Sequence, residues 1–165
     1  MGFEYADLDR QTRDLMVQEL ESDLLADTVY VSKRLTPEGK LAWPGLLKEA
    51  ALEHDDNWLA GQLLGRRYLV QEGRFPNPEL LTEGEFNRYY VRAICLRALA
   101  GGWTEVLVVR GRLAMTPRPE SEALVGSHLP AAALLGDLRT SQGKVPRLRV
   151  GVPNSHLTVR LLEEP

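Results

Sequence analysis

The sequence predicts an α+β fold, with a helical N-terminal half and a small, mostly antiparallel sheet in the C-terminal half. Two observations support this fold class. Apolar residues recur at helical spacing through most of the first hundred residues, and after the glycine pair at 101–102 the apolar period changes from 3.6 to 2. The chain has 165 residues, which suits one domain, so we expect a single α+β domain over 1–165 without internal repeats.

The helical part is expected over about residues 7–65. Its first helix, over 7–26, has leucines on one stripe, and Asp7 or Asp9 is placed to cap its N-terminus. The next segment, 27–35, contains several β-branched residues and is either a short strand or a last helical turn.

Two more helices are predicted before residue 66. A turn at 36–39 precedes the first of them, and Pro44 fits its first position, where the missing N–H costs nothing. Asp55 or Asp56 can cap the next helix, which ends near Gly65.

A flexible loop is predicted over about 71–81, because glycine and proline cluster there. A central helix follows over about 83–100. Its start is predicted from a capping box, in which the Thr82 hydroxyl and the Glu85 side chain each accept a backbone N–H.

The sheet-containing part is expected over about 104–162. Alternating apolar and polar residues predict strands, and prolines open two short helical segments. The last two strands are predicted to form a hairpin through four loop residues. The expected elements are a strand at 104–115, helices at 119–125 and 130–139, and strands at 147–152 and 157–162.

Charge is distributed unevenly along the chain. Residues 1–60 hold 6 Lys and Arg against 13 Asp and Glu, a net charge of −7, whereas residues 61–165 have a net charge of +4. Either the two signs interleave on the folded surface, or the chain presents unlike-charged surfaces to copies of itself or to a partner.

Arginine and tyrosine on the central helix and the first strand supply the candidate contacts. Both residue types are enriched in protein interfaces and also suit phosphate groups. Arg88 and Arg92 are four residues apart on the predicted helix, and their repulsion calls for a compensating group, either Glu85 or a phosphate. The candidate interface or phosphate contacts are Arg88, Tyr89, Arg92, Arg110 and Arg112.

Catalytic and metal-binding signatures are missing from the sequence. His54, His128 and His156 have no metal-ligand spacing, and Cys95 lies within an apolar helical stretch, as a buried structural cysteine would. The sequence has no phosphate-binding glycine loop and no nucleophile elbow. We therefore expect no catalytic residues, no cofactor and no metal, and a protein that is not an enzyme.

Membrane insertion and secretion are not expected either. No apolar run approaches the roughly 20 residues that span a bilayer, and the N-terminus lacks the basic and apolar regions of a secretory signal. The expected location is the cytoplasm or a virion.

The pattern LTEGEFNRYYVRAICLRAL, followed by a strand and then by RPESEALVGSHL and LLGDLR, resembles uncharacterised proteins of tailed-bacteriophage genomes. The resemblance covers residues 82–139, about a third of the chain. It implies a virion-associated structural protein, either a capsid decoration protein or a head–tail neck component built as a ring. It implies no catalytic residues.

The function predicted from these observations is that of a structural or interaction protein, which assembles through contacts with copies of itself and with other assembly proteins. The alternative is a small intracellular enzyme or a nucleic-acid-associated factor. That alternative would use Arg88, Arg92, Arg110 and Arg112 against phosphates.

Overall fold

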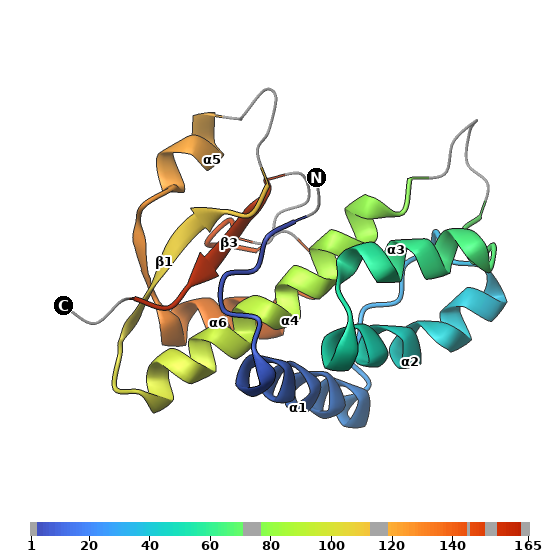
Figure 1. The fold of residues 1–165 in the computed structure, drawn as a ribbon, viewed down its shortest axis with the longest axis horizontal. Coiled ribbons are helices and arrows are strands. Elements are labelled where there is room, and N and C mark those ends of the chain that lie inside the picture. The colour runs from blue at the N-terminus through green and yellow to red at the C-terminus, as the bar shows by residue number, and fades with distance from the viewer. Residues whose placement is uncertain (1–2, 71–76, 113–118, 145, 151–154, 163–165) are drawn as a thin grey trace.

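The computed structural model describes residues 3–70, 77–112, 119–144, 146–150 and 155–162, and its fold is shown in Figure 1. Helices dominate the N-terminal half, and three strands lie in the C-terminal half, so the α+β prediction is confirmed. In chain order the elements are α1 (Arg10–Ala26), α2 (Pro37–Glu53), α3 (Asp56–Gly65), α4 (Glu79–Ala100), β1 (Glu105–Arg110), α5 (Pro119–Leu124), β2 (His128–Pro130), α6 (Ala131–Thr140) and β3 (Leu157–Arg160).

Helix α4 is the centre of the molecule. The helices α1 and α3 pack against it, as do α6 and the strands β1 and β3, so α4 runs between the helical part and the sheet (Figure 1). Every residue from Glu85 to Cys95 is buried. A helix that is covered on all sides has no solvent face, and each polar side chain on this stretch must find its partners inside the protein.

The sheet has the strand order β2-β1-β3, and both strand pairs are antiparallel. Val106 and Val108 of β1 are buried on the face that packs against α4, while the residues between them are partly exposed. This alternation explains why the change of apolar period after the glycine pair predicted the sheet correctly.

The N-terminal segment packs inside the fold. Phe3 stacks on Tyr5, whose ring also contacts Phe86 and Tyr90 of α4. The backbone N–H of Glu4 donates to the carbonyl of Gly111 just beyond β1 (2.7 Å). A Cβ atom at residue 111 would collide with the Phe3 ring, so this approach requires glycine.

Two of the predicted helix caps are confirmed. Asp9 caps α1 by accepting the backbone N–H of Thr12 (3.0 Å), and Asp55 caps α3 by accepting that of Trp58 (2.9 Å). Each carboxylate satisfies a backbone donor that the helix cannot satisfy itself.

The turn predicted at 36–39 is wrong, because α2 begins there. Thr36 is its N-cap and accepts the N–H of Gly39 (3.0 Å). The proline at the first helical position is therefore Pro37, and Pro44 lies inside the helix. Residues 27–35 form neither of the two predicted structures, and Leu35 at the end of this segment forms an isolated antiparallel bridge with Leu69.

The capping box at Thr82 and Glu85 is also wrong. Helix α4 begins one turn earlier, at Glu79, whose N–H donates to Oδ1 of Asn77 (3.0 Å). The Thr82 hydroxyl donates within the helix to the Glu79 carbonyl, and Glu85 is left as a buried interior residue. Residues 79–81 of the predicted loop thus belong to α4, while 71–76 lie outside the described residues.

The C-terminal hairpin is not formed as predicted. Residues 147–150 make turns rather than a strand, and 151–152 lie outside the described residues. Strand β3 pairs with β1, with Val159 opposite Val108, and β2 was not predicted at all. The choice of strand partner depends on how the sheet packs on α4, which an alternating pattern does not encode.

Candidate functional site

A buried ion cluster joins α1 to α4. The guanidinium of Arg92 donates to both carboxylate oxygens of Asp23 (2.7 and 3.1 Å) and from Nε to Oε1 of Glu19 (2.9 Å). The two carboxylates are one turn apart on α1, so a single arginine on α4 reaches both. Arg92 is only 1 % exposed, and a charge this deeply buried is tolerated because charged partners surround it.

Four more side chains donate hydrogen bonds to these carboxylates, and one of them is Thr28, whose hydroxyl donates to Oδ1 of Asp23 (3.3 Å). Arg139 of α6 donates to both oxygens of Glu19 (2.8 and 2.9 Å), and Asp23 accepts from the Tyr89 hydroxyl (2.7 Å) and from Gln142 (2.8 Å). Burial on its own would raise the pKa of each carboxyl group. The hydrogen bonds, chiefly from the arginines, outweigh it and hold both pKa values below their usual range.

Part of the negative charge of the N-terminal region is thus neutralised within the fold by the positive charge of the later region. Acidic residues of α1 pair with arginines of α4 and α6, and the pair between Asp9 and Arg97 (2.9 Å) extends this contact towards the surface. Of the two interpretations left open by the sequence, this arrangement resembles interleaving, although the charges meet between helices rather than on a surface.

Three of the five candidate contact residues are buried. Arg88 is 5 % exposed, and Tyr89 and Arg92 are 1 % exposed. These three side chains do not lie on an open surface, because they belong to the stretch 85–95 of α4, which is buried throughout. Helical spacing places Arg88 and Arg92 on one face correctly, but it does not show that α1 and α6 cover that face.

Arg110 and Arg112 are partly exposed and lie close to carboxylates. Arg110 donates to Glu122 of α5 (3.0 Å) and to the carbonyl of Ser155 (3.3 Å). Arg112 binds Glu83 of α4 (2.9 Å). Their role as interface or phosphate contacts stays a prediction, and any partner would compete with these intramolecular pairs.

A second polar cluster lies around Glu83. Burial raises the pKa of Glu83 to about 7, and Arg112 opposes this shift. Nδ1 of His156 is 3.9 Å from Oε2 of Glu83. Burial also raises the pKa of Asp56, to about 6, and the Tyr5 hydroxyl beside it is buried.

The Glu83 cluster contains acids and bases of several types, but its members are tied to the fold. Glu83 is held by Arg112, and Asp56 lies in the first turn of α3 and is 2 % exposed. Within the described residues, no group of three or more His, Cys, Asp and Glu side chains is placed to hold a metal ion. These contacts tie the Glu83 cluster to α3, to α4 and to the segment that follows β1.

The most open candidate site is a pocket of about 300 Å³ beside the first half of α4. It combines apolar walls with basic side chains and one carboxylate, and it is small for a ligand site. The residues that line it are Tyr30, Ser32, Arg34, Leu80, Leu81, Gly84, Glu85, Arg88, Gly143 and Lys144.

Glu85 and Arg88 face each other at this pocket. The predicted compensation of Arg88 by Glu85 is confirmed, but the contact is long, with Nε 3.6 Å from Oε2. Arg88 donates from Nη1 to the carbonyl of Leu138 (3.0 Å) and to the Ser141 hydroxyl (3.1 Å), while its buried Nε forms no hydrogen bond within the described residues. Burial raises the pKa of Glu85 to about 6, although Arg88 and Arg92 oppose the shift.

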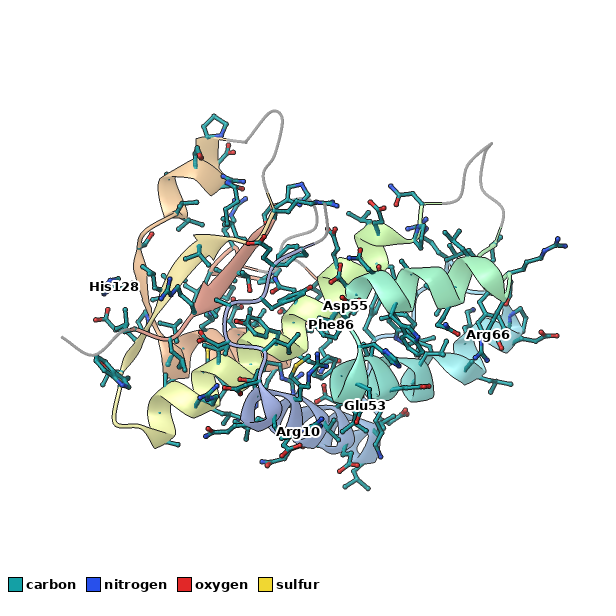
Figure 2. The ribbon with its side chains drawn as sticks, in the orientation of Figure 1. Arg10, Glu53, Asp55, Arg66, Phe86 and His128 are labelled. Carbon is teal, nitrogen blue, oxygen red and sulfur yellow. The ribbon has the colours of Figure 1, made fainter. Side chains whose placement is uncertain are left out.

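The three histidines lie in different parts of the fold. His54 caps the C-terminus of α2 and stacks on Trp58, with ring centroids 4.2 Å apart. Figure 2 shows His128 at the outer side of the sheet, away from Phe86 and α4. Cys95 is completely buried, and burial raises the pKa of its thiol to about 12, so the prediction of a buried structural cysteine is confirmed.

The comparisons with known proteins found no match among protein-family models, curated proteins or solved structures. In the part of the chain that the structure describes, no helix combines the length and apolar character needed to cross a membrane.

Sequence reasoning missed the acidic half of the ion cluster and most of the pocket. Glu19 and Asp23 look like ordinary outer-face residues of an amphipathic helix. Their spacing of four residues places both carboxylates on one side of α1, where the single guanidinium of Arg92 reaches them, but nothing local in the sequence identifies that partner. Arg34 and Lys144 come from segments 110 residues apart, and nothing local in the sequence connects them.

Proposed function

We propose that this protein works by contact, as an assembly subunit that binds copies of itself. The observation that carries the proposal is the exposure of two leucines in regular helices. Leu25 of α1 is 92 % exposed and Leu41 of α2 is 87 % exposed. Single exposed apolar residues are common on protein surfaces, whereas apolar side chains that gather on one face suit a contact with another protein.

The two leucines lie on one face of the α1–α2 pair. The helices are antiparallel, since Arg13 near the start of α1 binds the carbonyl of Ala51 near the end of α2. Glu21 and Lys48 meet across the pair (2.9 Å). Leu25 lies one turn after Glu21 on α1, and Leu41 lies two turns before Lys48 on α2, so each leucine shares a helix face with its charged residue. Because the helices are antiparallel, both leucines lie on the same side of the Glu21–Lys48 pair.

This face is suited to pairing with itself. It carries an apolar part beside one acidic and one basic side chain, Glu21 and Lys48, which are both about half exposed. A two-fold axis would bring Leu25 and Leu41 of two copies together and place each charge opposite its counterpart. Isologous contacts of this kind are the commonest in homo-oligomers.

The alternative function, an arginine-rich face that binds nucleic acid, has less support. Of its four arginines, Arg88 and Arg92 are buried. Arg110 and Arg112 are each within 3.0 Å of a carboxylate oxygen. Binding to phosphates would have to break these pairs, and the buried two would first have to become accessible.

The setting we propose for this subunit is a bacteriophage virion, as a capsid decoration or head–tail neck component. It rests on the resemblance of residues 82–139 to phage-encoded proteins. A structural subunit also requires a rigid body, and the ion cluster that ties α1, α4 and α6 together would supply one.

The test is the oligomeric state of the full chain as a function of concentration, measured by sedimentation velocity. The wild type is expected to associate into a discrete oligomer. The double substitution Leu25→Glu with Leu41→Glu is expected to leave a monomer, because it places charge in the centre of the proposed contact.

A matched control is Leu99→Glu, near the C-terminal end of α4, where the leucine is 39 % exposed. It should leave association unchanged. A wild-type chain that stays monomeric at high concentration would contradict self-assembly, and equal effects of the control and the double variant would contradict the assigned face.

A further inference from the structure

The pocket beside α4 contains a carboxylate that the fold itself does not use fully. Glu85 is 7 % exposed, yet within the described residues its carboxylate accepts no hydrogen bond, and its nearest cation is Nε of Arg88 at 3.6 Å. The same Nε is buried without a hydrogen-bond partner there. Buried charged groups are ordinarily satisfied by hydrogen bonds, so the Glu85 carboxylate, which lines the pocket, has acceptor capacity for a donor from outside the fold.

The rim of the pocket is basic. Arg34 and Lys144 both line it, and neither forms an ion pair with any residue in the described part of the chain. Arg34 uses one guanidinium nitrogen to bind the carbonyl of Asn77, which fixes the side chain and leaves its other nitrogens available. Two free cations around one opening attract a negatively charged group.

The remaining wall is apolar. Leu80 is 39 % exposed and lies beside Leu81 on the first turn of α4. Tyr30 and Gly143 also line the pocket, and the Tyr30 ring lies about 3 Å from the point that a Cβ atom on Gly143 would occupy. Gly84 contributes no side chain, and a Cβ placed there would meet nothing within 4 Å, so the glycine keeps this part of the pocket open.

We propose that this pocket binds a small α-amino or α-hydroxy acid with an apolar side chain. The amino or hydroxyl group donates to the Glu85 carboxylate, and the ligand carboxylate binds the cations Arg34 and Lys144. The apolar side chain packs against Leu80 and Leu81. This site is independent of the proposed self-association through Leu25 and Leu41.

The chemistry of the lining residues explains why the ligand must carry both groups. An anion without a donor would meet the Glu85 carboxylate with no compensating hydrogen bond, which is unfavourable in a partly enclosed site. A cation alone would be repelled by Arg34, Arg88 and Lys144. An inorganic anion would in addition leave the leucine wall uncovered.

The experiment is an NMR titration of the ¹⁵N-labelled full chain at neutral pH with four compounds that carry the same isobutyl group. They are L-leucine, 2-hydroxy-4-methylpentanoate, 4-methylpentanoate and 3-methylbutylamine. The first two are expected to shift the amide signals of Gly84 and Lys144 at millimolar concentration. The third lacks the donor and should bind about tenfold or more weakly, and the amine, which lacks the anion, should not bind.

Two pairs of variants test the assigned residues. Gly84→Leu is expected to fill the pocket and abolish binding, whereas Gly61→Leu, at an equally open helical glycine of α3, should have no effect. Lys144→Glu is expected to weaken binding at least tenfold, whereas Arg147→Glu, at a nearby exposed arginine, should change it little. All four positions are exposed or open, so the fold is expected to survive each change.

Several results would overturn the proposal. They are the absence of any shift with leucine or its hydroxy analogue, equal binding of 4-methylpentanoate and leucine, and unchanged binding in the folded Gly84→Leu or Lys144→Glu variant. Because the oligomeric state is measured separately, failure of this proposal is distinguishable from failure of the proposed self-assembly.

Discussion

Arg88 and Arg92 lie one turn apart on the same buried helix, but their surroundings differ. Arg92 makes three charge-assisted hydrogen bonds to two carboxylates, at 2.7 to 3.1 Å. Arg88 has one carboxylate, Glu85, at 3.6 Å, and a nitrogen that no described residue binds. In the middle of α4, every charged group is therefore bound by an opposite charge. In its first half, the charged groups of Glu85 and Arg88 beside the pocket are not fully hydrogen-bonded.

Hydrogen bonding distinguishes the structural arginine from the arginine beside the pocket. Both arginines are buried and both have acidic neighbours, so burial and charge alone do not separate them. The number and length of the hydrogen bonds do, because a structural ion cluster satisfies its members and a binding site leaves room for its ligand. The comparison predicts that disturbing Arg92 affects folding, while disturbing the Glu85 region affects pH response and binding.

The largest effect is expected from Arg92→Met. Removing the guanidinium leaves Asp23 and Glu19 buried beside a side chain that cannot donate to them, although Arg139 still holds Glu19. Breaking a buried ion pair on one side typically costs about 3–5 kcal/mol. Chemical denaturation of the wild type and the variant at neutral pH measures this loss.

The control for this change is Arg97→Met, farther along α4. Arg97 pairs with Asp9, whose side chain is 57 % exposed, and pairs of this kind contribute about 0–1 kcal/mol. Similar losses for both variants would show that the central cluster is no more important to stability than a surface pair, and the comparison between the two halves of α4 would fail.

The next effect concerns pH. Glu85 has a raised pKa of about 6 in the folded protein, against an ordinary value of 4.5, so the folded state holds its proton more tightly than the unfolded chain. Stability is therefore lost as the pH rises from about 4.5 through 6, by about 2 kcal/mol for this group. Glu85→Gln removes the titration, so it should match the wild type near pH 4.5 and exceed it in stability by about 2 kcal/mol at pH 7.

The ion cluster should respond in the opposite direction. Asp23 and Glu19 have lowered pKa values in the folded protein, so the stability they contribute is fully present above their unfolded pKa values and is lost as the pH falls through the folded ones. Denaturation curves measured from pH 2.5 to 7 test both effects, the loss of stability at acidic pH and the loss as the pH rises above 4.5. If the Glu85→Gln variant loses as much stability above pH 4.5 as the wild type does, the loss comes from other groups with raised pKa values, Asp56 and Glu83, and not from Glu85.

The elements of this fold were predictable where the signal is local. The caps Asp9 and Asp55, the period change after the glycine pair and the buried Cys95 are each encoded within a few residues, and all are confirmed. The start of α4 was not, because residues 82–85 have the sequence of a capping box although the helix begins at Glu79. In the folded protein, the apolar contacts of Leu81 extend the helix through that box.

The candidate site was less predictable for a physical reason. Arg88 and Arg92 were singled out correctly as charges in need of compensation, and Glu85 was named as a partner of Arg88. The surroundings of Arg88 and Arg92 differ because of residues that are distant in sequence. Asp23 of α1 binds Arg92, whereas Arg34 and Lys144 line the pocket beside Arg88. Single-sequence patterns describe one element at a time and do not show which face of another element it meets.

The smallest effect is expected from Gly84→Ala, and it tests whether the open half of α4 is kept open at a cost to stability. Gly84 lies inside the helix, and a Cβ there would contact nothing within 4 Å, so alanine fits without strain. Replacing glycine by alanine inside a helix gains about 0.5–1 kcal/mol through lower backbone entropy in the unfolded chain. Thermal denaturation should show this gain, and the titration with L-leucine should show weaker binding, because the methyl group occupies part of the pocket.

A gain in stability with unchanged binding would mean that the ligand does not reach Gly84, and a loss of stability would mean that the space at this position is not open.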